Sequence, residues 1–306
     1  MTLAAQAARA IALAGDLPTG LTPSELRVLY TEQRLKLQPP PPEVAEVREI
    51  TIPGRDGPLL ARVYVPVKDD RIRPLLVYYH GGGWVVGSLQ GYDTPCRRLA
   101  LKCDCVVVSV DYRLAPEHPF PAAVHDAWDA TTWCVAHAAD LSIDPARIIV
   151  AGDSAGGTLA AVVAQQARDE GAPAIALQVL IYPAVDLTRE TDSYVRNAEG
   201  CMLTTAALRW FYERYVPDPG QRSDWRASPL LRSSLKGVAP ALIISAEHDP
   251  LVDENEAYAK RLRADGVPTQ YVCFAGMIHP FFTLGGVIDD AAAAEEIIAR
   301  AVSRFA

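Results

Sequence analysis

Ser154 stands in a sequence pattern that can turn a serine hydroxyl into a nucleophile. Residues 148–159 read Ile-Ile-Val-Ala-Gly-Asp-Ser-Ala-Gly-Gly-Thr-Leu, so an apolar, β-branched run breaks at Gly152 and helix-forming sequence resumes after Gly156. A serine at the apex of a strand-turn-helix has a strained backbone, and the residues two before and two after it must be very small. The spacing can arise by chance, but this context predicts that Ser154 projects its hydroxyl out of the fold.

A nucleophilic serine also needs donors for an oxyanion, and a glycine loop can supply them. An apolar run over residues 75–79 ends directly in His-Gly-Gly-Gly-Trp at positions 80–84. Consecutive glycines have no side chains in the way, so several of their backbone N–H groups can point into one concave site. Gly-Gly-Gly by itself could be only a flexible loop. Its position directly after a buried strand favours an oxyanion hole, completed by the N–H of Ala155.

The base that activates the serine must be a histidine, and His279 is the best placed of six. It lies in Gly-Met-Ile-His-Pro-Phe-Phe at positions 276–282, just past the last predicted strand and before the last predicted helix. A loop there would deliver it to the strand ends. The other five lie in the glycine loop, between prolines, on a predicted helix or before an Asp-Pro break: His80, His118, His125, His137 and His248.

The acid that orients the histidine is predicted to be Asp249. It follows the predicted strand over residues 241–246 and precedes Pro250, which fixes the backbone. Glu247 and Asp253 are the alternatives, although Asp253 also suits a helix cap.

The elements that must position these residues alternate along the chain. Apolar runs without interruption indicate strands buried on both faces of a mostly parallel sheet, and the alternation with helices implies a doubly wound α/β fold. A stiff spacer of four prolines covers residues 39–42. We expect strands over 47–52 and 60–65 (a hairpin), 75–79, 105–110, 147–151, 176–182, 241–246 and 270–274, and helices over 3–13, 23–37, 122–138, 155–170, 204–215, 255–265 and 289–305.

The alternation is interrupted over about residues 186–235, which is too long for a simple loop. Ligands of open α/β sheets bind at the carboxyl ends of the strands, where an insertion after Tyr182 would lie, so we favour a helical cap. The alternative is that the insertion packs on the sheet edge with its aromatic residues as a small core of its own. The predicted division is residues 186–235 for the cap insertion, 46–185 with 236–306 for the catalytic domain, and 1–45 for a helical N-terminal part.

The composition excludes several classes of protein. Lys and Arg number 29 against 37 Asp and Glu, the net charge is −8, and no basic run occurs, which argues against a nucleic-acid partner or a polybasic membrane anchor. No apolar stretch approaches the ~18 residues that span a bilayer. Arg9 interrupts the Ala-rich start, which favours an amphipathic helix over a signal peptide.

The six cysteines show neither metal-site spacing nor a disulfide framework. The closest pair, Cys103 and Cys105, falls in an apolar segment that we interpret as one strand. We therefore expect buried free thiols in a reducing cytoplasm.

Five motifs in fixed order resemble the bacterial hormone-sensitive-lipase-like family of α/β-hydrolase fold esterases. They are the glycine loop at 80–84, Asp-Tyr-Arg-Leu-Ala-Pro-Glu-His-Pro at 111–119, Gly-Asp-Ser-Ala-Gly-Gly at 152–157, Asp-Pro-Leu at 249–251, and the His279 loop. The resemblance extends from about Ile52 to the C-terminus. The segment 111–121 has no necessary chemical part and is expected to be a buried scaffold behind the glycine loop.

The resemblance implies a serine carboxylesterase that hydrolyses short- to medium-chain acyl esters through an acyl-enzyme, without a cofactor or metal and commonly as a homodimer. It implies Ser154 as nucleophile, His279 as base and Asp249 as orienter. Gly82, Gly83 and Ala155 would be the oxyanion donors. The resemblance alone implies that residues 1–45 share in the helical cap. Candidates for the walls of the substrate pocket are Trp84, Phe281 and Phe282, although each could be ordinary core.

Two other functions use the same fold. A ligand-binding protein that has lost hydrolysis typically lacks the catalytic histidine, and His279 is present. Amide or peptide hydrolysis and sugar deacetylation use the same triad, and the sequence leaves them open.

Overall fold

An eight-stranded sheet forms the centre of the computed structural model, which describes residues 2–15 and 20–305. Met1, residues 16–19 and Ala306, which fall within the predicted regions 1–45 and 236–306, lie outside the described residues. The strand order is β1-β2-β4-β3-β5-β6-β7-β8. The strands are β1 Glu46–Gly54, β2 Gly57–Val65, β3 Arg73–Tyr79, β4 Val106–Asp111, β5 Ile143–Asp153, β6 Ile175–Ile181, β7 Ala241–His248 and β8 Thr269–Ile278.

The sheet is mostly parallel, as predicted. β1 and β2 form the expected hairpin, and β2 also runs antiparallel to β4, whereas β3 to β8 pair in parallel. Gly54 is the register partner of Gly57, so Arg55 and Asp56 make a tight turn. The parallel strands place their carboxyl ends at one end of the sheet, where residues from distant parts of the chain meet.

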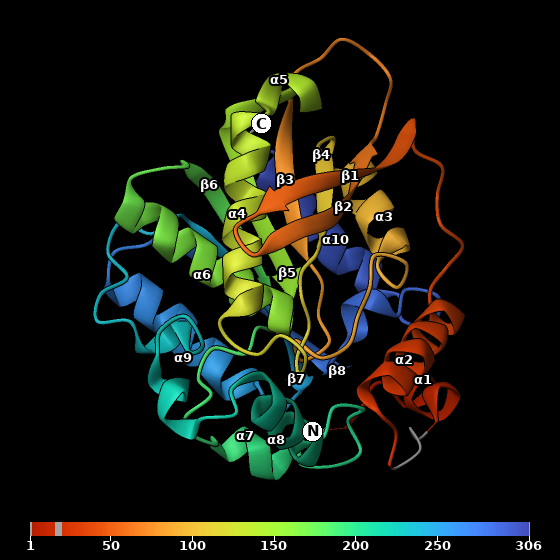
Figure 1. The fold of residues 1–306 in the computed structure, drawn as a ribbon. Coiled ribbons are helices and arrows are strands. Elements are labelled where there is room, and N and C mark those ends of the chain that lie inside the picture. The colour runs from red at the N-terminus through yellow and green to blue at the C-terminus, as the bar shows by residue number, and fades with distance from the viewer. Residues whose placement is uncertain (1, 16–19, 306) are drawn as a thin grey trace.

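Helices cover both faces of the sheet, which confirms the doubly wound class (Figure 1). Buried residues of α3 and α10 form one apolar cluster with the sheet, and those of α4, α6 and α9 form the other. Their bounds are α3 Asp93–Cys103, α4 Ala122–Ala136, α6 Ala155–Glu170, α9 Val252–Ala264 and α10 Asp290–Val302, with a short α5 at Ala138–Leu141.

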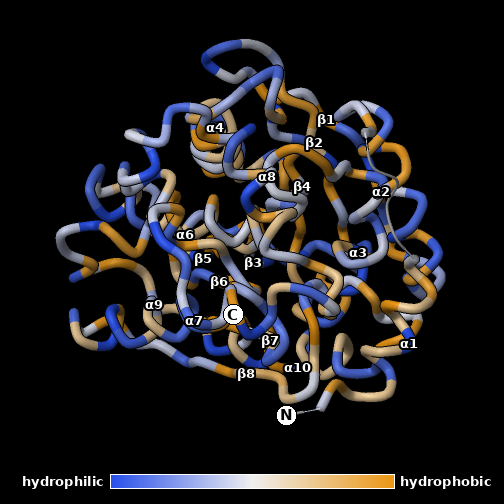
Figure 2. Tube along the Cα trace, turned by 90° about the horizontal axis from the view of Figure 1, so that it is seen from below, coloured by the Kyte–Doolittle hydropathy of each residue, from blue (hydrophilic) through white to orange (hydrophobic). Residues whose placement is uncertain are grey.

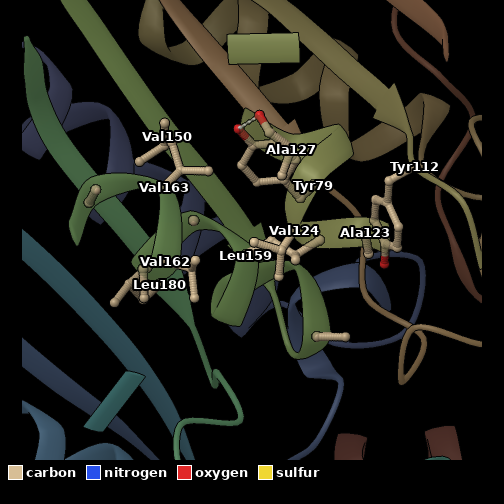
Figure 3. Close-up of a cluster of buried hydrophobic side chains, with 14 of the residues drawn as sticks. Tyr79, Tyr112, Ala123, Val124, Ala127, Val150, Leu159, Val162, Val163 and Leu180 are labelled. Carbon is tan, nitrogen blue, oxygen red and sulfur yellow. Dashed lines mark hydrogen bonds between the residues drawn. The ribbon is translucent and has the colours of Figure 1, made fainter. Parts of the chain in front are cut away.

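The core is built by the alternation of side chains along the central strands. In β3, Leu75 and Val77 belong to the cluster that includes α4 and α6, and Leu76 belongs to the cluster of α3 and α10. Figure 3 shows part of the first cluster, where Val150 of β5 lies beside Val163 of α6. β3 and residues 148–153 of β5 are buried on both faces, so the turn after each strand follows a rigid, packed segment.

Two helical segments lie at the carboxyl ends of the strands (Figures 1 and 2). One comprises α1 Ala5–Ala14 and α2 Pro23–Leu37, and the other α7 Asp192–Arg196 and α8 Thr205–Tyr215. α2 begins with Thr22 and Glu25 in a capping box and Pro23 in the first turn. Three 3₁₀ turns complete the fold: η1 Pro219–Ser223, η2 Pro229–Leu231 and η3 Phe281–Thr283.

Three helices were not predicted from the sequence, namely α3, α7 and the four-residue α5. α3 reads Asp-Thr-Pro-Cys-Arg-Arg-Leu-Ala-Leu-Lys-Cys, in which an early proline and charged residues obscure the helical period, and α7 has five residues, too few to show one. Placing Cys103 and Cys105 in one strand was therefore wrong. Cys103 ends α3, Asp104 caps it in the left-handed conformation, and Cys105 precedes β4.

The cysteines are free thiols, but one of them differs from the prediction of burial. Cys96, Cys103, Cys105, Cys134 and Cys201 are buried, whereas Cys273 is exposed. It lies on β8, an edge strand whose first seven residues are exposed or only partly buried. In the part of the chain that the structure describes, no helix is long and apolar enough to cross a membrane.

Candidate active site

The turn between β5 and α6 holds Ser154 in a strained conformation. Its φ is 54° and its ψ is −120°, a combination that L-residues seldom adopt. The small neighbours are required: a Cβ atom on Gly156 would lie 1.9 Å from the carbonyl oxygen of Tyr79, and one on Gly152 would lie 2.4 Å from the Gly156 backbone. The Ser154 N–H donates to the carbonyl of Ile181 at 2.8 Å. The serine is partly exposed while the rest of the turn is buried.

Ser154, His279 and Asp249 form a continuous hydrogen-bonded series. His279 Nδ1 lies 2.7 Å from Asp249 Oδ2, and His279 Nε2 lies 3.0 Å from Ser154 Oγ. An ionised carboxylate only accepts hydrogen bonds, so Nδ1 carries the proton and Nε2 is left to accept the serine O–H. His279 and Asp249 are buried, with 5% and 0% exposure. This tautomer allows the histidine to take a proton from the hydroxyl.

Asp249 is fixed by the loop that follows β7. Its Oδ1 accepts the N–H of Leu251 at 2.9 Å, and its own carbonyl accepts the side-chain amide of Asn197 at 2.9 Å. Asn197 follows directly after α7, so the insertion contacts the carboxylate loop. Sequence reasoning missed this residue because a lone Asn after a five-residue helix carries no distinctive spacing.

His279 follows β8 directly, because that strand extends to Ile278, four residues beyond its predicted end. The Tyr182 ring lies 4.3 Å from the imidazole, centroid to centroid, at 52°. The strand end and the tyrosine ring together fix where the imidazole points.

The glycine loop after β3 presents unpaired backbone donors. Gly82 and Gly83 have φ values of 123° and 58°, which only glycine adopts readily. Among residues 2–15 and 20–305, the N–H groups of Gly82, Gly83 and Ala155 donate to no protein acceptor. Ala155 also begins α6, whose N-terminus favours negative charge. These donors can therefore serve an anion that forms beside Ser154.

Asp153 joins the serine turn to the glycine loop, a role that the sequence analysis did not assign. Its Oδ1 accepts the N–H of Gly81 at 2.8 Å and the Tyr78 O–H at 2.9 Å, and its Oδ2 accepts the Tyr92 O–H at 2.9 Å. The carboxylate is fully buried. Its position inside the Gly-Asp-Ser motif was the sequence signal that could have pointed to a role for Asp153. Its hydrogen-bond partners, however, lie 61 to 75 residues away in the sequence, so the motif alone does not identify them.

The segment 111–121 is only partly the buried scaffold that was predicted. Tyr112 is buried, donates to the carbonyl of His80 at 2.7 Å and stacks on its ring at 4.3 Å. Residues 116–119, in contrast, are exposed. Glu117 forms a bidentate pair with Arg27 of α2, so this stretch holds the N-terminal helix against the loop.

The predicted pocket residues are buried in the core around the site. Trp84 is 1% exposed and stacks on Tyr215 at 4.1 Å and 5°. Phe281 and Phe282 are 0% and 2% exposed. The structure thus gives them a packing role, and a part in the substrate pocket stays a prediction. Phe211 of α8 does lie at the site, because a Cβ atom on Gly83 would be 2.3 Å from its ring.

A serine turn between strand and helix, with histidine and aspartate on loops after later strands of a mostly parallel sheet, defines the α/β-hydrolase class. A model of the alpha/beta hydrolase fold family matches residues 76–283, and the chain belongs to the hormone-sensitive-lipase-like family of α/β hydrolases.

Curated relatives and solved structures agree on the activity. The carboxylic ester hydrolase LipN of Mycobacterium tuberculosis is 46% identical over 85% of this chain and 71% of its own, and the ethyl acetate hydrolase of Pseudomonas putida is 43% identical over 80% and 78%. The hyperthermophilic esterase of Pyrobaculum calidifontis superposes over 100% of both chains with a TM-score of 0.93 and 42% identity. The protein is a carboxylic ester hydrolase.

Proposed function

We propose that Ser154 is the nucleophile of a serine carboxylesterase, with His279 as its base and Asp249 as the residue that orients and charge-stabilises the imidazole. The observation that carries this proposal is the series of contacts at 3.0 Å and 2.7 Å through the two ring nitrogens. Serine, base and acid are thus within hydrogen-bond reach in the order that acyl transfer requires.

In the proposed reaction, His279 takes the Ser154 proton as Oγ attacks the ester carbonyl carbon. The carbonyl oxygen becomes an oxyanion that accepts from the N–H groups of Gly82, Gly83 and Ala155. When the C–O bond breaks, His279 protonates the leaving alcohol and an acyl-enzyme remains. Water then repeats both steps, with His279 again as base, and releases the acid.

The substrates that we propose are short- to medium-chain acyl esters. The name of the Pseudomonas putida relative, ethyl acetate hydrolase, supports a short acyl group. The Phe211 ring against Gly83 bounds the space beside the proposed oxyanion donors. We propose that residues 1–45 and 186–235 act as a cap, supported by the contacts of Arg34 with Thr283, of Asn197 with the Asp249 loop and of Phe211 with Gly83. Homodimer formation stays a prediction, which light scattering after gel filtration would test.

A chain-length series of p-nitrophenyl esters on the wild type and on Ser154→Ala tests this proposal. We expect a maximum between acetate and octanoate for the wild type, and loss of about four or more orders of magnitude in kcat for the variant. Far-ultraviolet circular dichroism should be unchanged in the variant. Wild-type turnover by Ser154→Ala would refute the assignment of the nucleophile, and a preference for esters longer than decanoate would refute the substrate range.

A further inference from the structure

Arg34 is a buried cation in the N-terminal helix α2 that the proposed reaction does not use. Its side chain is 5% exposed, and it donates to the hydroxyls of Tyr30 and Thr283. Its guanidinium carbon lies 4.6 Å from the ring centroid of Tyr30 and 4.9 Å from that of Tyr92. Within the described residues, its Nε has no hydrogen-bond partner and its guanidinium makes no salt bridge. A buried charge without a counterion is costly, so its charge must be balanced further away.

Asp153 is the matching buried anion. Its carboxylate is 0% exposed and is bound by neutral donors, the hydroxyls of Tyr78 and Tyr92 and the N–H of Gly81. No Lys or Arg in the described part of the chain reaches it within salt-bridge distance. Tyr92 connects the two charges, because its ring faces Arg34 and its hydroxyl donates to Asp153 Oδ2 at 2.9 Å.

Asp153 and Arg34 both contact segments that carry the proposed catalytic residues. Asp153 directly precedes Ser154 and holds Gly81, which precedes the proposed oxyanion donors of the glycine loop. Arg34 also donates to Thr283, in the 3₁₀ turn that follows the His279 loop. Arg34 therefore contacts both Tyr92, which binds Asp153, and Thr283, which follows the His279 loop.

We propose that Arg34 is a positioning residue of the esterase, whose charge balances the Asp153 carboxylate beside the site where the oxyanion forms. This inference rests on the proposed function of Ser154 and its donors. An unbalanced carboxylate would repel the oxyanion through a low-dielectric interior and so raise the free energy of the transition state. An arginine stays charged under all such conditions, as this role requires.

The test compares Arg34→Met, Arg34→Lys and a matched control, Arg27→Met. Arg27 also lies on α2, where it binds the carbonyls of Val85 and Ala115 at 2.8 and 2.9 Å, so its loss weakens the docking of the helix without removing the buried charge. With p-nitrophenyl acetate we expect Arg34→Met to lower kcat at least tenfold with KM changed less than threefold. Arg34→Lys should restore most of kcat, and Arg27→Met should keep kcat within twofold.

A transition-state analogue separates positioning from general structural damage. The Ki of a trifluoromethyl ketone, which forms an oxyanion on the serine, should rise in Arg34→Met by about the factor by which kcat/KM falls. Asp153→Asn should lower kcat by a smaller factor in the Arg34→Met protein than in the wild type, because in the Arg34→Met protein it also removes an unbalanced charge. If Arg34→Met does not fold, Arg34→Lys and Tyr92→Phe carry the test, with kcat nearly kept in the first and lowered in the second.

Several outcomes would overturn the proposal. They are an Arg34→Met protein with kcat within twofold of wild type, an equal loss in Arg27→Met, or strictly additive effects of the Arg34 and Asp153 substitutions. These results are distinct from a failure of the proposed function, which would show as activity in Ser154→Ala. An inactive Ser154→Ala with a normal Arg34→Met would reject this inference alone.

Discussion

Replacing Glu254 with glutamine should stabilise the protein at alkaline pH and leave its stability at pH 5 nearly unchanged. The side chain is fully buried in the first turn of α9. Its Oε1 accepts the Val185 N–H at 2.6 Å, and its Oε2 accepts the Tyr194 O–H at 3.1 Å. Burial raises the pKa of this carboxyl from 4.5 to about 8, although the hydrogen bond from Val185 acts in the opposite direction.

The sign of the effect follows from which state holds the proton. In the unfolded chain the carboxyl loses its proton near pH 4.5, whereas the folded protein keeps it up to about pH 8. Between these values the folded state binds more protons, so the free energy of unfolding falls as pH rises, by about 1.4 kcal/mol per pH unit. The total is about 5 kcal/mol as an upper limit. Glutamine stays neutral and keeps an acceptor oxygen for Val185, so it avoids this loss.

Urea unfolding followed by tryptophan fluorescence at pH 5, 7 and 9 measures the difference between the two proteins. Other titrating groups are shared and cancel in the comparison. We expect Glu254→Gln to be within about 1 kcal/mol of the wild type at pH 5 and several kcal/mol more stable at pH 9. A difference that stays constant from pH 5 to pH 9 would refute the reasoning, since it would mean that burial does not raise this pKa.

Two further predictions concern the geometry of the site. Gly156→Ala should destabilise the protein by about 3 kcal/mol or more and lower kcat, because the new Cβ meets the Tyr79 carbonyl oxygen at 1.9 Å, and that backbone lies in the central strand β3. An unchanged Tm would contradict it. Asp249→Asn should lower kcat by about 10³- to 10⁴-fold, because an amide no longer holds the His279 tautomer that can accept a proton. Steady-state kinetics check this, and a loss below tenfold would contradict it.

The sequence was most informative about the site where a strand pattern is followed closely by a helix pattern, as around Ser154 and His279. The serine turn was predictable because an apolar run, two flanking glycines and a helix-forming run are together typical of a strand-turn-helix with the serine at its apex. The position of His279 followed in the same way from the last strand and the last helix. The fold class followed from the alternation of elements, which the strand order and the helices on both faces confirm.

The supporting contacts could not be predicted, because they join distant residues without a periodic signal. Arg34 and Thr283 are 249 residues apart, and Asn197 and Asp249 are 52 apart. Burial of a single polar residue depends on the three-dimensional packing around it. Trp84 shows the same limit, since an aromatic residue beside a glycine loop suits a pocket wall and a core stack equally well, and the structure places it on Tyr215.

Active-site labelling tests the central claim most directly. The protein is incubated with a p-nitrophenyl phosphonate, and the release of p-nitrophenol, the residual activity and the modified peptide are measured together. The proposal that Ser154 attacks the substrate predicts one equivalent of p-nitrophenol per chain, full loss of esterase activity and a phosphonyl group on Ser154. Labelling of a different residue would contradict it, and so would complete loss of esterase activity in protein whose Ser154 carries no phosphonyl group.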